Sequence, residues 1–345
     1  MPHDNSYVLV TGASGFVGSN IVKYLAERGR KVLGTTRNDG GPGPLVEDYL
    51  EGLEKNVSWV TLDLTDSDRV MKIANAYDLS GIIHAAVFTA VSKEVEQMST
   101  RAILESNLLG TVNTLELARV AGVDRFVYVS SSGVYGSTED PTVLVSESSP
   151  YPYLNMSGFY SITKIASEKL TERYGQLFPM TTTSMRIAAP YGNMERPTRS
   201  RNLMGPIYRL LHHILTEKKE IIKVKGLAYV RDWTFVMDTA KCLVSGLDAK
   251  EPLSPLYNAS CEVNSSLEEI LTAIQEVPEV NFEWEEVEMD KDADFSVKVS
   301  SLRGPLSIKK AREELGFKPQ YDLKQGILEY CDWWKKSMKK GLWPP

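Results

Sequence analysis

TGASGFVG, at residues 11–18, follows the apolar run YVLV and precedes a segment with helical spacing at 16–29. Between a strand and a helix, each glycine of this stretch has a physical task. Gly12 permits a tight turn, Gly15 lets the backbone approach a pyrophosphate at the helix N-terminus, and Gly18 lets the helix pack closely on the strand. The alternative is a turn that only packs, but the strand–turn–helix setting favours a dinucleotide site. No Gly-Lys-Ser/Thr follows, which disfavours a P-loop nucleotidase.

Short apolar runs rich in β-branched residues alternate with helical segments through the first half of the chain. The expected strands are 7–11, 31–37, 57–64, 81–86, 125–131 and 181–187, with helices notably at 94–121 and 158–177. This alternation predicts an α/β fold, a Rossmann-type doubly wound parallel sheet with right-handed crossovers. We expect a dinucleotide-binding domain at 1–187 plus about 229–260. A smaller, discontinuous C-terminal substrate-binding domain would comprise 188–228 and 261–345.

The composition limits the classes of partner. The 345 residues carry a formal net charge of −6 and no basic block, so a nucleic-acid partner is not expected. Three cysteines and four histidines lack metal-ligand spacing, so we expect no metal site. No apolar stretch reaches the roughly 18–20 residues that span a bilayer. The sequence therefore predicts a cytoplasmic protein that acts on a small molecule.

The residues after the second and third strands bear on the cofactor. An acidic residue after the second strand would bind the adenosine ribose hydroxyls, but GTTRN has Arg37 there. Arginine pairs with a 2′-phosphate, which favours NADP, with NAD as the alternative if Arg37 is only solvated. Asp63 can accept from the adenine amino group. Helix capping is its alternative role, although Asp66 is better placed for that.

Further motifs follow in one order: LDLTD, HAA, NLLGT, YVSSSGVYG and YSITK, and later RIAAPYG, VRDWTFVMDTAKCL and KKAREELGFKP. In this set and order the chain resembles the extended short-chain dehydrogenase/reductase family, of the epimerase/dehydratase type, which includes UDP-galactose 4-epimerase. The resemblance covers most of the chain.

The resemblance implies a catalytic group of Ser131, Tyr160 and Lys164. Tyr160 would be the acid/base, and Lys164, one helical turn on, would favour the phenolate of a group whose free pKa is near ~10. Ser131 would orient the substrate oxygen. The implied cofactor contacts, beyond the glycines, Arg37 and Asp63, are Ser14, Phe16, Val17, Leu64, Ala85, Ala86, Val87, Asn107, Ser130, Tyr160, Lys164 and Ala188.

The chain departs from the nucleotide-sugar members of that family. Ser132 and Gly133 stand where dehydratases carry an Asp-Glu pair, and Ala188-Ala189 replaces a substrate asparagine. LRGPLS (302–307) lacks the family's aspartate, whereas Arg231 matches an arginine that often holds a diphosphate. Ser132 and Arg231 are therefore candidate substrate residues.

The loop YGNMERPTRSRN (191–202) adds three arginines: Arg196, Arg199 and Arg201. Arginines in a substrate loop suit a carboxylate, phosphate or sulfonate. The alternative is a solvated basic loop or a subunit contact.

From these features we expect an NADP-dependent oxidoreductase that interconverts a secondary alcohol and a ketone on a small polar, carbohydrate-like substrate. The first alternative is a sugar epimerase that retains its cofactor, and the second is a non-catalytic NADP-sensing regulator. The resemblance also implies a homodimer in which helices at 94–121 and 158–177 pair across a two-fold axis.

Overall fold

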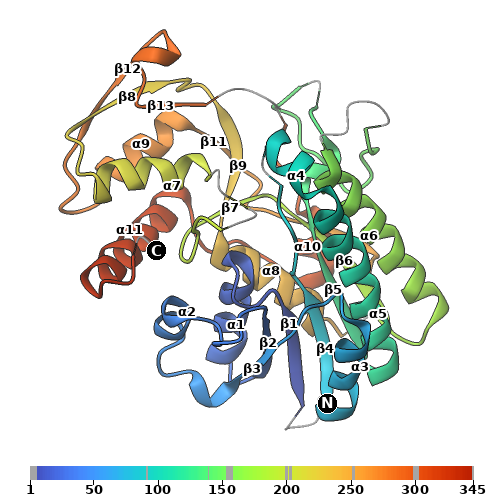
Figure 1. Cartoon of the computed structure of the whole chain (residues 1–345). Coiled ribbons are helices and arrows are strands. Elements are labelled where there is room, and N and C mark those ends of the chain that lie inside the picture. Colours follow the sequence, from blue (N-terminus) through green and yellow to red (C-terminus); the bar gives the residue numbers. More distant parts are fainter. Residues whose placement is uncertain are drawn as a thin grey trace.

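A computed structural model of the chain describes residues 6–90, 92–138, 140–152, 158–198, 201, 204–250, 253–297 and 303–343. Within these residues a seven-stranded sheet has the order β10-β6-β5-β4-β1-β2-β3 (Figure 1). Every strand pair in it is parallel. Its strands are β1 (Tyr7–Thr11), β2 (Lys31–Thr36), β3 (Val57–Thr61), β4 (Leu79–His84), β5 (Arg125–Ser131), β6 (Thr181–Ile187) and β10 (Leu256–Ala259). The predicted Rossmann-type fold is confirmed.

Helices cover both faces of this sheet. The helices of this half are α1 (Phe16–Glu27), α2 (Pro44–Tyr49), α3 (Ser67–Ala76), α4 (Lys93–Leu104), α5 (Gly110–Ala121), α6 (Gly158–Leu177), α8 (Val236–Asp248) and α10 (Lys309–Leu315). Helix α1 packs against α8, while α3 packs against α5 and α6 against β5 and β6. A π-helical turn, Glu105–Leu109, joins α4 to α5, and 3-10 turns lie at Glu54–Asn56 and Ser132–Tyr135.

The alternation of side chains along β1 explains why this sheet is buried on both faces. Val8 and Val10 belong to the hydrophobic cluster under α1 and α8, whereas Leu9 belongs to the cluster under α3 and α5. Successive residues of a strand point to opposite faces, so an uninterrupted apolar run fits a strand covered on both sides.

The second region is built from two small sheets and three helices, in the upper left of Figure 1. One sheet has the order β11-β9-β7 and the other β12-β8-β13. The strands are β7 (Ala189–Tyr191), β8 (Ile221–Lys225), β9 (Val230–Phe235), β11 (Asn264–Ser266), β12 (Glu283–Glu286) and β13 (Phe295–Ser296). The helices are α7 (Pro206–Leu211), α9 (Leu267–Gln275) and α11 (Leu323–Lys339), with a π-helical turn at His212–Thr216 and a 3-10 turn at Asp290–Asp292.

The two regions share a hydrophobic core, because the cluster under α1 and α8 continues to Ile270 of α9 and Trp334 of α11. Within 229–260, α8 and β10 lie with the large sheet, but β9 pairs with β7 and β11 instead. The division into two domains stays a proposal, and β9 is the element in it that belongs structurally with the substrate side.

Candidate active site

A cavity of about 840 Å³ opens at the carboxyl ends of the parallel strands and extends to the second region. This edge of an open α/β sheet is where such folds bind ligands. The predicted residues that line it are Gly12, Ser14, Gly15, Phe16, Val17, Gly18, Arg37, Asp63, Leu64, Ala85, Ala86, Val87, Ser130, Ser131, Tyr160, Lys164, Ala188, Arg196, Arg201 and Arg231. Thr35, Phe88 and Thr198 also line it and were missed, although each lies within a few residues of a predicted one. The cavity gathers the predicted residues, and their individual roles remain predictions.

The phosphate loop has the shape that its glycines predict. Gly12 has φ +65°, and a Cβ added to it would lie 2.7 Å from the Cα of Ala86. A Cβ on Gly18 would lie 2.1 Å from the carbonyl oxygen of Gly12. Helix α1 begins after Gly15 without a side-chain cap, so N–H groups of its first turn are left for a ligand. The loop therefore fits a pyrophosphate.

At the adenosine end, the exposed Arg37 follows β2 at the cavity wall. Asp63 also lines the wall, and its Oδ1 accepts hydrogen bonds from the backbone N–H of Thr65 at 2.9 Å and from the Thr65 hydroxyl at 2.8 Å. The cap of α3 is Asp66, which accepts from the N–H of Arg69. Asp63 is thus not the helix cap, which leaves the adenine contact as its predicted role.

Tyr160 and Ser131 meet at the centre of the cavity. A Cβ on Gly133 would lie 3.2 Å from Ser131 Oγ and 3.8 Å from Tyr160 Cε1, so this glycine makes room for both side chains. Burial raises the pKa of Tyr160, while a hydrogen bond with the Ser131 hydroxyl and the charge of Arg201 act to lower it. The pair therefore suits proton transfer to and from a substrate oxygen.

Lys164 lies beneath the tyrosine and is almost fully buried. Its Nζ is 5.8 Å from the centroid of the Tyr160 ring and donates to the carbonyl oxygen of Val129 at 2.6 Å. Burial lowers the pKa of Lys164 to about 7, against the opposing charge of Glu168. Desolvation thus disfavours the charged form of Lys164, and its role of favouring the Tyr160 phenolate stays a prediction.

A buried ionic network supports α6 from below. Glu168 accepts from Arg186 Nε at 2.9 Å and Nη2 at 2.8 Å, and it also accepts from the hydroxyls of Ser130 at 2.5 Å and Tyr151 at 2.7 Å. Although burial disfavours its charge, hydrogen bonding to Glu168 holds the pKa of Arg186 above its usual value. Because Glu168 is one helical turn after Lys164, this network fixes the helix that carries Tyr160 and Lys164.

Asn107, which the family resemblance also implies to support the lysine side, does not line the cavity, and its predicted cofactor contact stays a prediction. It is buried in the π-helical turn, where its side chain accepts from the N–H of Phe88 at 2.7 Å and donates to the Thr163 hydroxyl at 3.1 Å. Since Phe88 lines the cavity and Thr163 precedes Lys164, Asn107 joins the cavity wall to α6. Its role is to position its neighbours.

Arg231 and Arg303 form the far end of the site. Both line a small second pocket beside Ser132; Arg231 also lines the main cavity, whereas Arg303 and Ser132 do not. Arg303 Nε donates to the carbonyl oxygen of Gly136 at 2.7 Å. Burial, and then the charge of Arg231, lower the pKa of Arg303 to about 10. Over the described residues no carboxylate forms an ion pair with either arginine, although Asp232 lines the same small pocket and its charge acts on Arg303.

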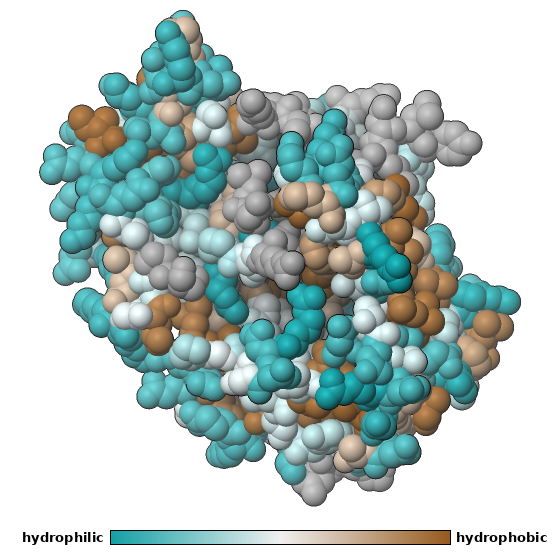
Figure 2. Space-filling view, in the orientation of Figure 1, coloured by the Kyte–Doolittle hydropathy of each residue, from teal (hydrophilic) through white to brown (hydrophobic). Residues whose placement is uncertain are grey.

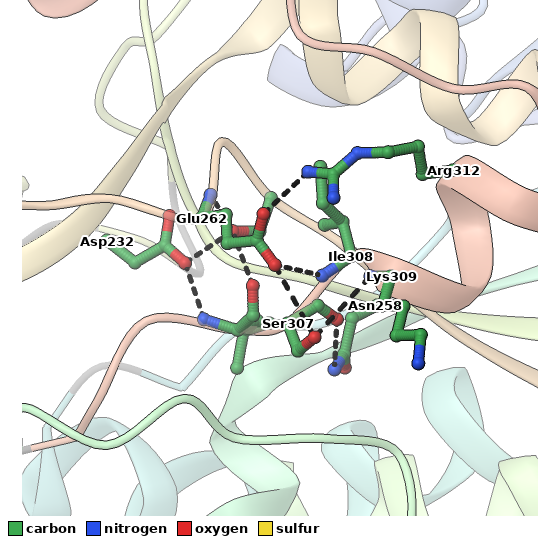
Figure 3. A network of polar contacts seen from close by, with 9 residues as sticks. Asp232, Asn258, Glu262, Ser307, Ile308, Lys309 and Arg312 are labelled. Carbon is green, nitrogen blue, oxygen red and sulfur yellow. Dashed lines mark hydrogen bonds and ion pairs between the residues drawn. The ribbon is translucent and has the colours of Figure 1, made fainter.

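Figure 3 shows the contacts that hold the segment after Arg303. Asp232 of β9 accepts from the N–H of Leu306 at 2.9 Å. Glu262 accepts from the N–H of Ile308 at 3.2 Å and pairs with Arg312 at 2.6 Å. These contacts fasten the chain on the C-terminal side of Arg303 to the small β11-β9-β7 sheet, which keeps that arginine beside Ser132. Sequence reasoning missed Arg303 because LRGPLS lacks the family aspartate.

The loop arginines separate in the structure. Arg196 lies over the phosphate loop, and its Nη2 donates to the carbonyl oxygen of Ser14 at 2.8 Å. Arg201 Nη2 pairs with the buried Glu195 at 2.8 Å, and its guanidinium lies 5.7 Å from the centroid of the Phe16 ring. Arg199 lies outside the described residues.

The fold and the Ser131–Tyr160–Lys164 group beside a dinucleotide cleft define an enzyme of the extended short-chain dehydrogenase/reductase type. The model of the NAD dependent epimerase/dehydratase family matches residues 8–259. The chain belongs to that family.

Relatives match along nearly the whole chain. A putative UDP-glucose 4-epimerase of Methanocaldococcus jannaschii is 30% identical over 96% of this chain and 99% of its own length. A UDP-glucuronate 4-epimerase of Thermodesulfobacterium geofontis is 27% identical over 96% of this chain and 97% of its own. A solved structure of Thermus thermophilus UDP-glucose 4-epimerase complexed with NAD has 25% identity and a TM-score of 0.74, covering 94% of this chain and 98% of that one.

No helix among the described residues is long and apolar enough to cross a membrane. No group of three or more His, Cys, Asp or Glu residues within those ranges is arranged to hold a metal ion.

Proposed function

We propose that the chain is a nucleotide-sugar 4-epimerase that retains a nicotinamide dinucleotide. The observation that carries the proposal is Arg231, which lines the cavity that holds Tyr160 and forms no ion pair with a carboxylate of the described residues, together with Arg303 in the small pocket beside it. Two cations without a carboxylate partner suit a substrate diphosphate. Relatives named as 4-epimerases of UDP-sugars match 95% or more of the chain, which favours the epimerase alternative over the oxidoreductase that we first expected.

In this mechanism the dinucleotide supplies reversible hydride acceptance. With a dinucleotide bound to accept the C4 hydride and return it to the opposite face, Tyr160 would take the proton of the sugar 4-hydroxyl and later give it back. Ser131 would hydrogen-bond the same oxygen. Arg231 and Arg303 hold the diphosphate through both steps. Substrate and product have the same oxidation state, so no second reactant is required.

The proposed cofactor is NADP, with NAD as the alternative, and Arg37 is the residue that would bind the 2′-phosphate. The Thermus thermophilus relative is described as a complex with NAD. Arg37 nevertheless lines the adenosine end of the cavity, and no acidic residue follows β2 directly. NADP therefore remains our prediction for this chain.

The test is to incubate the purified protein with UDP-glucose or UDP-glucuronate and no added cofactor. We expect the 4-epimer to form, detected by chromatography, without a net change in absorbance at 340 nm. A ketone product formed in proportion to reduced cofactor would favour the oxidoreductase instead. No turnover of either sugar, or of other nucleotide sugars, would contradict the proposal.

We also propose the two-fold dimer predicted from the sequence. Large exposed hydrophobic side chains occur on α4, α5, α6 and the π-helical turn: Met98, Leu109, Val120, Ile162 and Leu177. Figure 2 shows hydrophobic patches on the side where Figure 1 draws α5 and α6. The mass in solution at micromolar concentration should be that of a dimer, and Val120→Lys should give a folded monomer. A monomeric wild type would refute this pairing.

A further inference from the structure

Arg196 differs from Arg201 in that its side chain forms a hydrogen bond with the backbone of the phosphate loop. Its Nη2 donates to the carbonyl oxygen of Ser14, between Gly12 and Gly15, at 2.8 Å. Its Nη1 is buried and has no hydrogen-bond partner among the described residues. A buried, unpaired donor on a cation carries a free-energy cost unless a ligand satisfies it. Arg196 also lines the cavity, so its positive charge lies beside the place where a ligand would bind.

Arg196 and Arg201 differ in whether a carboxylate neutralises them. Arg201 pairs at 2.8 Å with Glu195, so its positive charge is largely neutralised within the protein. Arg196 forms no ion pair with a carboxylate in the part of the chain that the structure describes. Of the two described arginines of this loop, Arg196 is therefore the one whose positive charge is not paired, and it lies beside the N-terminus of α1. A pyrophosphate bound at that helix terminus would lie against it.

The position of Arg196 is set by the fold, since its loop is fastened to α1 at a second point. Asn20 of α1 donates from Nδ2 to the carbonyl oxygen of Asn193 at 3.0 Å, and Asn20 Oδ1 accepts from the Tyr49 hydroxyl at 2.7 Å. Between the two anchors, Met194 has φ +72° and a fully buried side chain. A non-glycine residue persists in that conformation only where its surroundings hold it there. The loop is thus a fixed cover over the start of α1.

From this geometry we infer that Arg196 is a clamp on the cofactor pyrophosphate, and that it serves to retain the cofactor and not to bind the sugar. The positive charge of Arg196 holds the pyrophosphate, while Nη2 keeps the side chain against Ser14. Departure of the cofactor then requires the loop to lose its contact with the phosphate loop. The inference rests on the proposed function for its assumption of a bound dinucleotide, and it assigns Arg196 to the cofactor instead of the substrate.

The experiment measures cofactor binding and leaves activity aside. Wild type, Arg196→Met and Arg196→Lys are stripped of dinucleotide, and the affinities for NAD, NADP, ADP and adenosine are measured by calorimetry. Loss of a charge-assisted contact should weaken dinucleotide and ADP binding roughly ten- to hundredfold in Arg196→Met. Adenosine, which has no pyrophosphate, should bind equally to all three proteins. Arg196→Lys should lie between the other two, because it keeps the charge without the second donor.

Two arginine variants serve as controls. Arg209→Met removes an arginine that lies on the Phe295 ring outside the cavity and should bind dinucleotide like the wild type. Arg231→Met should lose affinity for the UDP-sugar and keep its affinity for the dinucleotide. Unfolding temperatures without ligand must agree among the variants, and Arg196→Lys carries the test if Arg196→Met does not fold. Unchanged ADP affinity in the Arg196 variants would overturn the clamp. Weak dinucleotide binding by the wild type itself would count against the proposed function instead.

Discussion

The half of the molecule that surrounds the phosphate loop and the half that surrounds Arg231 are built in different ways. The first is a parallel sheet whose ligand-binding residues follow consecutive strand ends, at residues 12–18, 35–38, 62–65, 85–89 and 129–131. The second is assembled from two three-stranded sheets, and segments distant in sequence meet there, as β9 and residues 303–308 do. Short apolar runs specify the first half locally. The second half depends on long-range polar contacts such as that of Asp232 with the N–H of Leu306.

Under the proposed function, the residues for catalysis lie in the first half and the residues for substrate recognition lie in the second. Ser131, Tyr160 and Lys164 come from β5 and α6, beside the large sheet, whereas Arg231 comes from the small β11-β9-β7 sheet and Arg303 from the segment fastened to it. Variants in the first half should therefore change the rate of chemistry or the cofactor, and variants in the second should change the substrate.

The largest expected effect follows from Tyr160→Phe in the first half. Turnover of the nucleotide sugar should fall by ~10²–10⁴ because the proton-transfer group is lost. The bound cofactor should be unchanged, since the ring still packs. Steady-state rates and cofactor content of the same preparation check this. Activity above roughly a tenth of wild type would remove Tyr160 from the acid/base role.

Glu168→Ala tests the network beneath the catalytic helix. It leaves Arg186 as a buried charge without its partner, so the free energy of unfolding should fall by about 3–5 kcal/mol. Chemical denaturation monitored by circular dichroism measures the change. The matched variant is Arg312→Ala, which removes the exposed partner of Glu262 and leaves Glu262 its hydrogen bond from the N–H of Ile308.

For Arg312→Ala we expect a loss of about 1 kcal/mol or less. Equal losses in Glu168→Ala and Arg312→Ala would mean that the buried network contributes no more than an exposed ion pair.

The next effect concerns the cofactor and is smaller. Arg37→Ala should lose a ten- to hundredfold preference for NADP over NAD, the equivalent of a charge-assisted contact of about 1.5–3 kcal/mol. Chromatography of the dinucleotide released on denaturation identifies the natural cofactor, and titration gives both affinities. A wild type that contains and prefers NAD would show that Arg37 does not read the 2′-phosphate.

The smallest expected effect concerns Arg201, a residue outside the first half, and the pKa of Tyr160 in the first half. The charge of Arg201 lowers the pKa of Tyr160, so Arg201→Met should raise that pKa. The active base is the phenolate, and the rate therefore increases as pH rises toward this pKa. In the variant the rising limb of the pH–kcat/KM profile should move to higher pH. An unmoved limb would mean that Arg201 acts on the substrate alone.

Sequence patterns predicted the first half well and the second half poorly, for a physical reason. Local rules apply to the glycine turn, to the strand ends and to the spacing of Tyr160 and Lys164, because the residues involved are neighbours in sequence. They do not apply to the pairing of Arg303 with the carbonyl oxygen of Gly136, which spans 167 residues. For Asn107 the family motif implied support of the lysine side, and its hydrogen bond to Thr163, next to Lys164, agrees with that role; its cofactor contact stays a prediction. The open donor of Arg196 likewise exists only once the loop is folded over Ser14.

In the proposed epimerase reaction, one hydride leaves C4 of a nucleotide sugar and returns to the same carbon. The most direct measurement uses UDP-glucose or UDP-glucuronate that carries deuterium at C4, with no added cofactor, and follows the product by proton NMR and mass spectrometry. We expect a 4-epimer that keeps its deuterium at C4, with no net change in the cofactor. Deuterium recovered in the dinucleotide, together with a 4-keto product, would refute the 4-epimerase and support the oxidoreductase function.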